Sequence, residues 1–403
     1  MTKRKFAWLA LAGAALSALL AVSAASHAEA QTIKIGIINT YSGPAAAVGD
    51  EMDKGLSLYV KLHEKDLPPG VKVELIKKDD GGPNPDVGKR LAQELITRDQ
   101  VQFISAVIWT PTGFAIAPMV EEAKVVFISS NAAGVALPRA SKYIARTSFT
   151  LWQQAYPLGK WAAQHGYKTA YTATSDFAPG HESAEAFAKG FTDGGGKVLD
   201  QVFFPVANPD FTPYLQRVKD AKPNVVFFFV PGGTQAPAIL KAYNDLGMKK
   251  AGITAIGTQD IVPDEQLPSI GDSAIGLITA GIYSAAGNRP ANKAFLAAWT
   301  KEYGDKQAPD FFAVDSYDAM NLIFDVIKHQ NGKFDPDQAM EFIKTWKNPN
   351  SPRGPISIDP ATRDIVQNVY IRRVQKVNGK LANVEIDTIK DVKDPWKEMN
   401  PPK

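Results

Sequence analysis

Short β-rich runs alternate with amphipathic stretches of helical length along most of this chain, and that alternation limits the folds it can adopt. Extended runs at residues 198–202 and 225–230 flank an amphipathic stretch at residues 211–221, whose apolar side chains recur at helical spacing. Such alternation is typical of βαβ units, which build parallel sheets. The run Val-Val-Phe-Phe-Phe-Val at residues 225–230 is apolar on both faces, as in a central strand covered by helices. The chain is therefore predicted to be an α/β protein with parallel sheets.

The remaining elements follow from the same two periodicities. Strands are predicted at residues 33–38, 73–76, 101–106, 125–128, 169–172, 278–283 and 369–374, the last followed by an Asn378-Gly379 turn, and helices at residues 49–62, 87–96, 112–123, 152–165, 183–191, 292–303, 312–328 and 337–346. The Pro- and Lys-rich end, residues 394–403, is expected to be a loosely held tail. The predicted strands and helices fall into two similar α/β halves.

The first 30 residues carry the pattern of a secretory signal peptide. Lys3, Arg4 and Lys5 precede an apolar run at residues 6–25, and Ala28-Glu29-Ala30 supplies a small-residue cleavage site. The apolar run is long enough to span a bilayer, so an uncleaved anchor stays open. Cleavage near Ala30 is favoured, which predicts a soluble protein exported to the periplasm. Removing 30 of the 403 residues leaves 373, enough for about two domains.

Charge and motifs argue against several classes of function. A net charge of +3 with interspersed signs predicts no binding to nucleic acid or anionic membranes. The chain has no cysteine, which excludes thiol nucleophiles and thiolate metal sites. It also lacks G-x-S-x-G, a phosphate-binding P-loop and H-E-x-x-H. Only His181 with Asp176 offers an acid–base pair, so we expect no catalytic site, no metal and no cofactor.

Specific residues carry a resemblance to a known family. Ile33-Lys-Ile-Gly-Ile-Ile38 is followed by Ser42-Gly43-Pro44, Gly49 and Asp79-Asp80, and a second matching stretch runs from residues 354–363 to 370–374. In this order, they resemble the leucine/isoleucine/valine-binding proteins, which are type I periplasmic solute-binding proteins of ABC importers. The resemblance covers nearly all of residues 31–380.

The resemblance implies two Rossmann-like lobes with parallel central sheets, joined by three hinge crossings near residues 147–150, 280–283 and 354–357. The implied division is residues 31–148 plus 283–354 for the N-terminal lobe, 149–282 plus 355–390 for the C-terminal lobe, and 391–403 for the tail. The ligand would lie between the lobes, where closure could signal loading to a membrane partner. Parallel α/β sheets independently favour that place, beyond the carboxyl ends of the strands. An ABC permease is the implied partner, and a monomer the implied state.

Two segments are candidates for holding a ligand carboxylate. Trp109-Thr110-Pro111-Thr112-Gly113 follows a strand and opens a helix, whose free N–H groups suit an anion. Thr110 matches the family's carboxylate-binding Ser, or it only caps the helix with Pro111 as first helical residue. Asn131, Ala132 and Ala133 match the second contact loop. Amino-acid binders carry a Thr where this chain has Ala133.

The second lobe departs further from the amino-acid binders. Gln259 stands where they place a Glu against the ligand's ammonium group, and Asp260 is its neighbour. A buried ammonium needs an opposing charge, so either Asp260 supplies it or the ligand has no ammonium. Rings near the expected cleft could line a slot for a flat ligand. These aromatic residues are Trp109, Phe149, Trp152, Phe177 and Tyr283, and Asp176 is a further candidate contact.

The favoured interpretation is a receptor for an aromatic carboxylate, resembling the aromatic-acid branch of the family. Two alternatives stay open: a branched-chain amino-acid receptor, in which Asp260 replaces the missing Glu, and a periplasmic sensor that reports ligand occupancy to a membrane kinase or chemoreceptor. An enzyme built on His181 and Asp176 is the remaining class, and we do not expect it.

Overall fold

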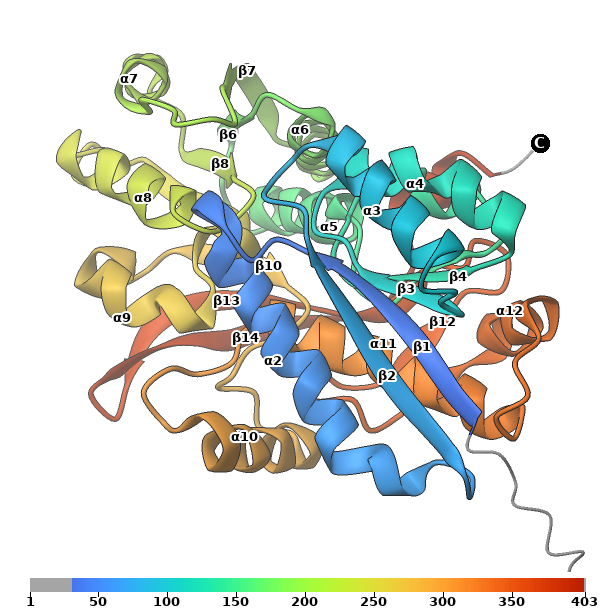
Figure 1. Ribbon diagram of the computed structural model, residues 1–403. Coiled ribbons are helices and arrows are strands. Elements are labelled where there is room, and N and C mark those ends of the chain that lie inside the picture. The colour runs from blue at the N-terminus through green and yellow to red at the C-terminus, as the bar shows by residue number, and fades with distance from the viewer. Residues whose placement is uncertain (1–30, 402–403) are drawn as a thin grey trace, which may run out of the picture.

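The computed structural model describes residues 31–401, which form two sheets with helices on their faces (Figure 1). The expected signal peptide, residues 1–30, lies outside the described residues. No helix among residues 31–401 is long and apolar enough to cross a membrane. The predicted α/β class with parallel sheets is confirmed.

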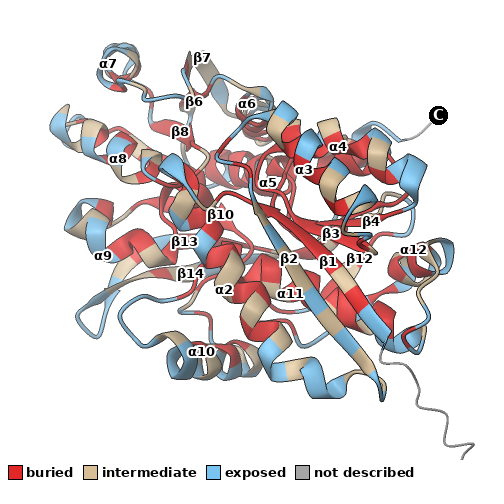
Figure 2. Ribbon diagram, viewed as in Figure 1, coloured by how far each residue is buried: buried red, intermediate tan, exposed pale blue. Residues whose placement is uncertain are grey.

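The first sheet has five parallel strands in the order β2-β1-β3-β4-β5. Buried residues run along β1, β3 and β4, whereas β2 at the edge is half exposed (Figure 2). We call this sheet with its helices the first lobe. Its strands are β1 (Gln31–Asn39), β2 (Val71–Asp79), β3 (Phe103–Ala106), β4 (Val126–Ser129) and β5 (Ile144–Arg146), and its helices α2 (Ala46–His63), α3 (Pro85–Thr97), α4 (Thr110–Ala123), α10 (Pro290–Tyr303), α11 (Phe311–His329) and α12 (Pro336–Thr345).

The second sheet has nine strands, with β8 (Val225–Phe229) fully buried near its centre, as its two-faced apolar sequence predicts. We call this sheet with its helices the second lobe. Its other strands are β6 (Thr169–Ser175), β7 (Lys197–Phe204), β9 (Thr254–Thr258), β10 (Ile278–Gly281), β11 (Lys347–Asn348), β12 (Ile356–Ile358), β13 (Ile365–Val377) and β14 (Lys380–Val392), and its helices are α5 (Leu151–Gln164), α6 (Ala178–Asp193), α7 (Thr212–Ala221), α8 (Gln235–Asp245), α9 (Leu267–Ile270) and α13 (Pro395–Met399).

The chain passes between the two lobes three times. The passages lie between β5 and α5, between β10 and α10, and between α12 and β11. The third comes earlier than expected at residues 354–357, because Lys347 and Asn348 already pair with β12 of the second sheet. These two residues fall within the range 283–354, which was expected to belong wholly to the first lobe.

Four strands of the second sheet, β9, β11, β12 and β14, have no counterpart among the predictions, and neither do helices α8 and α9 of the second lobe. The strand expected to be last, β13, forms an antiparallel hairpin with β14 through Asn378-Gly379. Both turn residues have positive φ, 50° and 79°, as a type I′ turn requires. Most residues of β14 are partly or fully exposed, so its sequence lacks a buried apolar run.

The prediction of a loosely held tail at residues 394–403 is wrong for most of that segment. Residues 394–399 form a capped helix, α13, in which the Asp394 side chain accepts hydrogen bonds from the N–H groups of Trp396 and Lys397. Lys397 is buried and its ammonium group contacts Asp364. A buried lysine is stable only when it is paired, and the pairing partner lies far away in the sequence.

Candidate functional site

The carboxyl ends of strands from both sheets meet at one cavity, with about 380 Å³ of space between protein atoms, part of which is open to solvent. Residues after β3, β4 and β5 line it from the first lobe and first passage, and residues at the ends of β6, β8 and β9 line it from the second lobe. This is where parallel α/β sheets bind ligands. The lining residues are Ile108, Trp109, Thr110, Asn131, Ala133, Phe149, Leu151, Phe177, Pro179, Phe229, Pro231 and Asp260.

The first turn of α4 opens onto this cavity. Trp109 is the N-cap and Thr110 the first helical residue, so Pro111 takes the second helical position rather than the first. The N–H groups of Thr110 and Thr112 have no acceptor within the helix. Thr110 Oγ1 accepts a hydrogen bond from the N–H of Gly134 at 3.1 Å, which leaves the hydroxyl proton available to a ligand. Together these donors and the helix dipole suit a carboxylate.

Trp109 is held in place by a short chain of hydrogen bonds. Its indole Nε1 donates to Thr40 Oγ1 at 3.0 Å, and the Thr40 hydroxyl donates to Asp80 Oδ1 at 2.6 Å. Asp80 is the second residue of the Asp79-Asp80 pair that contributed to the family resemblance. The pair therefore supports the cavity wall through Thr40, a role that its sequence alone does not indicate.

The loop after β4 contributes two residues to the cavity. Asn131 Nδ2 donates to the carbonyl of Ile108 at 3.1 Å, whereas its Oδ1 has no hydrogen-bond partner within residues 31–401. Ala133 is the second lining residue. Ala132 does not line the cavity, because its side chain packs in the core and its N–H donates to Val107.

Asp260 faces the cavity from the second lobe. It lies in the single turn Gln259–Ile261, directly after β9, and is only 4% exposed. Its Oδ2 is buried and has no hydrogen-bond partner in the described part of the chain. Burial raises the pKa of Asp260 to about 6, against the opposing effects of the Thr258 hydroxyl and the Arg372 charge.

Gln259 points elsewhere. Its side-chain oxygen accepts a hydrogen bond from the N–H of Ile282 at 2.9 Å, which ties the end of β9 to the second passage between the lobes. It does not line the cavity, so the expected contact between Gln259 and the ligand is absent from this geometry. Adjacent residues thus take different roles: Gln259 holds the passage and Asp260 faces the ligand space.

Aromatic side chains form much of the cavity wall. The rings of Phe177 and Phe229, from the second lobe, stack with centroids 6.0 Å apart and planes at 20°. Phe149, on the first passage, packs edge-on against Phe311 with centroids 5.8 Å apart. Phe229 and Pro231 were not predicted, although Phe229 ends β8 and Pro231 follows the run at residues 225–230, so the strand-end rule could have identified them. Ile108, Leu151 and Pro179 were also missed.

Three further predicted contacts lie away from the cavity lining. Trp152 is buried on α5 and stacks on Tyr156, with ring centroids 6.3 Å apart. Tyr283 is fully buried and donates a hydrogen bond to Asn292 at 2.9 Å. Asp176 is exposed and pairs with His181 at 2.8 Å on the surface.

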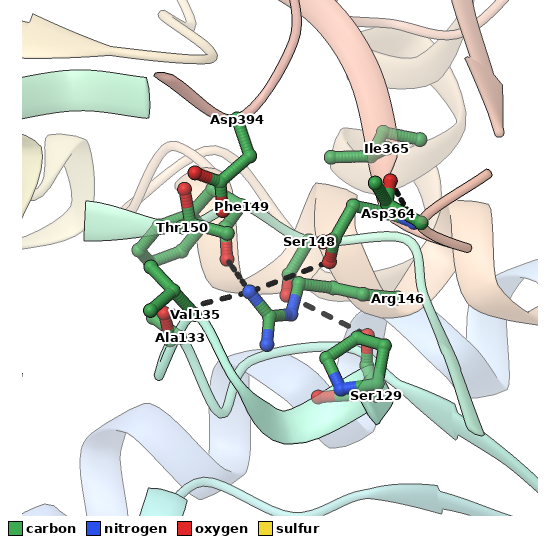
Figure 3. Close-up of polar contacts among 12 residues, drawn as sticks. Ser129, Ala133, Val135, Arg146, Ser148, Phe149, Thr150, Asp364, Ile365 and Asp394 are labelled. Carbon is green, nitrogen blue, oxygen red and sulfur yellow. Dashed lines mark hydrogen bonds and ion pairs between the residues drawn. The ribbon is translucent and has the colours of Figure 1, made fainter. Parts of the chain in front are cut away.

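A buried arginine, Arg146, holds the cavity loop in place. This role was not predicted from the sequence. Arg146 ends β5, and its side chain has no exposure to solvent. Figure 3 shows its guanidinium group beside Ala133, Phe149 and Asp364. It donates at 3.4 Å to the carbonyls of both Ala133 and Phe149, each of which lines the cavity, and also to the carbonyl of Gly134.

One contact joins the lobes directly beside the cavity. Glu182 of α6 accepts a hydrogen bond at 3.1 Å from the N–H of Val135, in the loop that follows β4. Burial raises the pKa of Glu182 to about 7. Because the two residues belong to different lobes, moving the lobes apart would break the contact.

The chain is similar to known periplasmic binding proteins in both sequence and structure. A sequence model of the family described as periplasmic binding protein matches residues 32–380. A solute-binding protein of an ABC transporter from Rhodopseudomonas palustris BisB5, solved in complex with 3,4-dihydroxybenzoic acid, is 46% identical, with a TM-score of 0.87 over 91% of this chain and 99% of that chain. A second R. palustris solute-binding protein, solved with 4-hydroxybenzoate, is 42% identical, with the same TM-score and coverage.

A curated relative points to the same family. The Leu/Ile/Val-binding protein homolog 6 of Brucella melitensis biotype 1 is 36% identical over 94% of this chain and 98% of its own length. These matches agree with the resemblance drawn from residues 33–80 and 354–374.

Proposed function

Because the chain belongs to the periplasmic binding protein family, we propose that it is the substrate-binding component of an ABC importer and captures an aromatic carboxylate between its lobes. One observation carries the choice of ligand: the first turn of α4, with the hydroxyl of Thr110, opens into a cavity walled by Trp109, Phe149, Phe177 and Phe229. Helix-end donors suit the carboxylate, and the rings suit a flat hydrophobic body. The two R. palustris relatives, both solved with hydroxylated benzoic acids, support this choice.

An amino acid is the second candidate, and Asp260 is the observation that favours it. Its buried carboxyl group faces the cavity and could pair with an ammonium group, and the B. melitensis relative is named for leucine, isoleucine and valine. Two features weigh against an amino acid. Gln259 is hydrogen-bonded to the second passage rather than facing the cavity, and the walls around Asp260 are mostly apolar and aromatic, which makes an ammonium group costly to bury.

The mature chain would begin after Ala30 and work in the periplasm as a monomer, delivering its ligand to an inner-membrane permease. The two lobes would open and close about the three passages, which lie between β5 and α5, between β10 and α10, and between α12 and β11. We propose no catalytic role, because the acid–base pair of His181 and Asp176 lies on the surface away from the cavity.

A thermal-shift panel tests the ligand class. Ligand-free residues 31–403, refolded from denaturant to remove any bound ligand, would be heated with benzoate, 4-hydroxybenzoate, cinnamate, leucine, valine or phenylalanine. A ligand at 100 times its dissociation constant stabilises the folded state by about 2.7 kcal/mol. We expect stabilisation by aromatic acids and none by the amino acids. Stabilisation by leucine or valine alone would overturn the aromatic assignment and favour Asp260 as the counter-charge for an ammonium group.

A further inference from the structure

The cavity proposed to hold an anion also contains a buried carboxyl group, and that combination needs a physical explanation. Asp260 is 4% exposed, and its Oδ2 has no hydrogen-bond partner within residues 31–401. It also makes no ion pair in that range, whereas its neighbour Asp264 lies 3.8 Å from the Arg372 guanidinium. A buried acceptor without a donor costs free energy, so a ligand that offers Asp260 a donor will bind better than one that does not.

The position of Asp260 indicates which end of the ligand carries that donor. Thr110 and the first turn of α4 come from the first lobe, whereas Asp260 follows β9 of the second lobe. Thr110 and Asp260 therefore line the cavity from different lobes, and a carboxylate placed on α4 leaves another group of the ligand to meet Asp260. The lining of the same cavity includes the apolar side chains of Phe149, Leu151 and Phe229.

The chemistry of the cavity indicates what kind of donor it is. Unsubstituted benzoate has no hydrogen to donate and would leave Asp260 unpaired. A ring hydroxyl can donate one hydrogen bond and is far cheaper to bury among apolar walls than an ammonium group. Asn131 Oδ1, a second buried acceptor without a partner in the described residues, also lines this cavity and could receive a further hydroxyl.

We infer that Asp260 accepts a hydrogen bond from a hydroxyl group on the ligand's aromatic ring, so that the protein selects hydroxybenzoates over benzoate. The inference rests on the proposed function, because it takes an aromatic carboxylate as the ligand. The phenolic O–H is the donor and the Asp260 carboxyl oxygen the acceptor. A hydrogen bond to a charged acceptor is worth about tenfold or more in affinity, and a site built to receive it discriminates against analogues that lack it.

Calorimetric titration of three ligands against three proteins tests this assignment. The ligands are 4-hydroxybenzoate, benzoate and 4-methoxybenzoate, which keeps the oxygen but has no hydrogen to donate. The proteins are the wild type, Asp260→Ala, and Asp176→Asn, a change to an exposed carboxylate outside the cavity. We expect the wild type and Asp176→Asn to prefer 4-hydroxybenzoate to both analogues by about tenfold or more. In Asp260→Ala the preference for 4-hydroxybenzoate over benzoate should fall to within about threefold, as expected when the acceptor is gone.

The outcomes distinguish failure of the role assigned to Asp260 from failure of the proposed function. If benzoate and 4-hydroxybenzoate bind the wild type equally, or if Asp260→Ala keeps the full preference, the role of Asp260 is wrong while the aromatic receptor stands. If no aromatic acid binds and leucine does, the proposed function itself is wrong. Because each comparison is a ratio of two ligands on one protein, a partial loss of folded Asp260→Ala does not change it. Should that variant fail to fold, Asp260→Asn replaces it: an amide is a weaker, uncharged acceptor, so the preference should shrink, and an undiminished one counts against the inference.

Discussion

Arg146 Nη1 lies 3.5 Å from Asp364 Oδ1, and both side chains are shielded from solvent. Asp364 also receives the ammonium group of Lys397 from α13, and Arg146 donates to the carbonyls of Ala133, Gly134 and Phe149 (Figure 3). One buried polar network therefore connects the cavity loop, the first passage between the lobes and the C-terminal helix. Loss of a single charge in it should affect both folding and binding.

Replacement of Arg146 by Met should destabilise the protein strongly. The substitution fills similar space but removes the cation, leaving buried carbonyl groups without donors and the charge of Asp364 balanced by Lys397 alone. Breaking one side of a buried ion pair typically costs about 3–5 kcal/mol. Urea unfolding followed by circular dichroism measures that loss. A change below about 1 kcal/mol, the scale of exposed ion pairs, would show that the network contributes little.

Arg90→Met is the matched control. Arg90 also pairs with a carboxylate, Glu94, at 2.6 Å, but its side chain is 60% exposed on α3. Exposed helix pairs are worth about 0.3–0.5 kcal/mol. The two arginines therefore separate the effect of burial from that of charge.

Substitutions at Thr110 should separate ligand binding from loop support. Thr110→Val removes the hydroxyl and should weaken binding of an aromatic carboxylate by about 1.5–3 kcal/mol, the usual worth of a hydrogen bond to a charged group. The same change also leaves the N–H of Gly134 without its acceptor, so the ligand-free protein should lose about 1 kcal/mol of stability as well. Thr110→Ser keeps the hydroxyl and should restore both. Unchanged affinity in Thr110→Val would remove Thr110 from the ligand site.

The sequence could locate much of this cavity but not orient its side chains. Trp109, Thr110, Asn131 and Asp260 follow buried strands, and the carboxyl ends of parallel strands converge in space, so their grouping follows from topology. Which of two neighbours faces the ligand depends on backbone direction after the strand ends. Gln259 and Asp260 are adjacent, yet their side chains point to different places. The periodicity of the sequence does not predict which of the two faces the cavity.

Long-range partners set a second limit. Arg146 ends a three-residue strand, and nothing in its local sequence indicates its partners. These are Asp364, which directly precedes β13, and through it Lys397 of α13. The prediction of a loosely held tail was wrong for the same cause. A segment rich in Pro and Lys is expected to be solvent-exposed, and its sequence does not show that a buried acid, Asp364, pairs with Lys397. Only the folded structure brings these charges together.

Truncation tests how firmly the C-terminal helix is held. Ending the chain after Lys393 removes α13 and takes Lys397 away from Asp364, so the free energy of unfolding should fall by about 3–5 kcal/mol, as for other broken buried pairs. Ending it after Asn400 removes only residues 401–403 and should change stability by less than about 0.5 kcal/mol. Equal melting curves for the two truncated proteins would mean that the segment is a loosely held tail after all.

The contact between Glu182 and the N–H of Val135 should make ligand binding depend on pH. Burial is the main cause that raises the pKa of Glu182 to about 7 when the contact is formed; the Val135 N–H and the Arg146 charge oppose the shift, and the charges of Asp394 and Glu185 add to it. When the lobes open, water reaches this carboxyl group and its pKa returns towards the ordinary value for Glu. A group whose pKa is raised on closure favours the closed state below its ordinary pKa, and that advantage is lost as the pH rises through about 7.

Affinity for an aromatic carboxylate should therefore fall, by roughly three- to tenfold, between pH 5.5 and pH 8. Glu182→Gln keeps an oxygen acceptor for the Val135 N–H but cannot ionise, so titrations across this range should show a smaller decline than the wild type. Asp245→Asn, at an exposed carboxylate on α8 that does not contribute to the Glu182 shift, should decline as the wild type does. If Glu182→Gln and the wild type give the same pH profile, Glu182 does not couple protonation to closure.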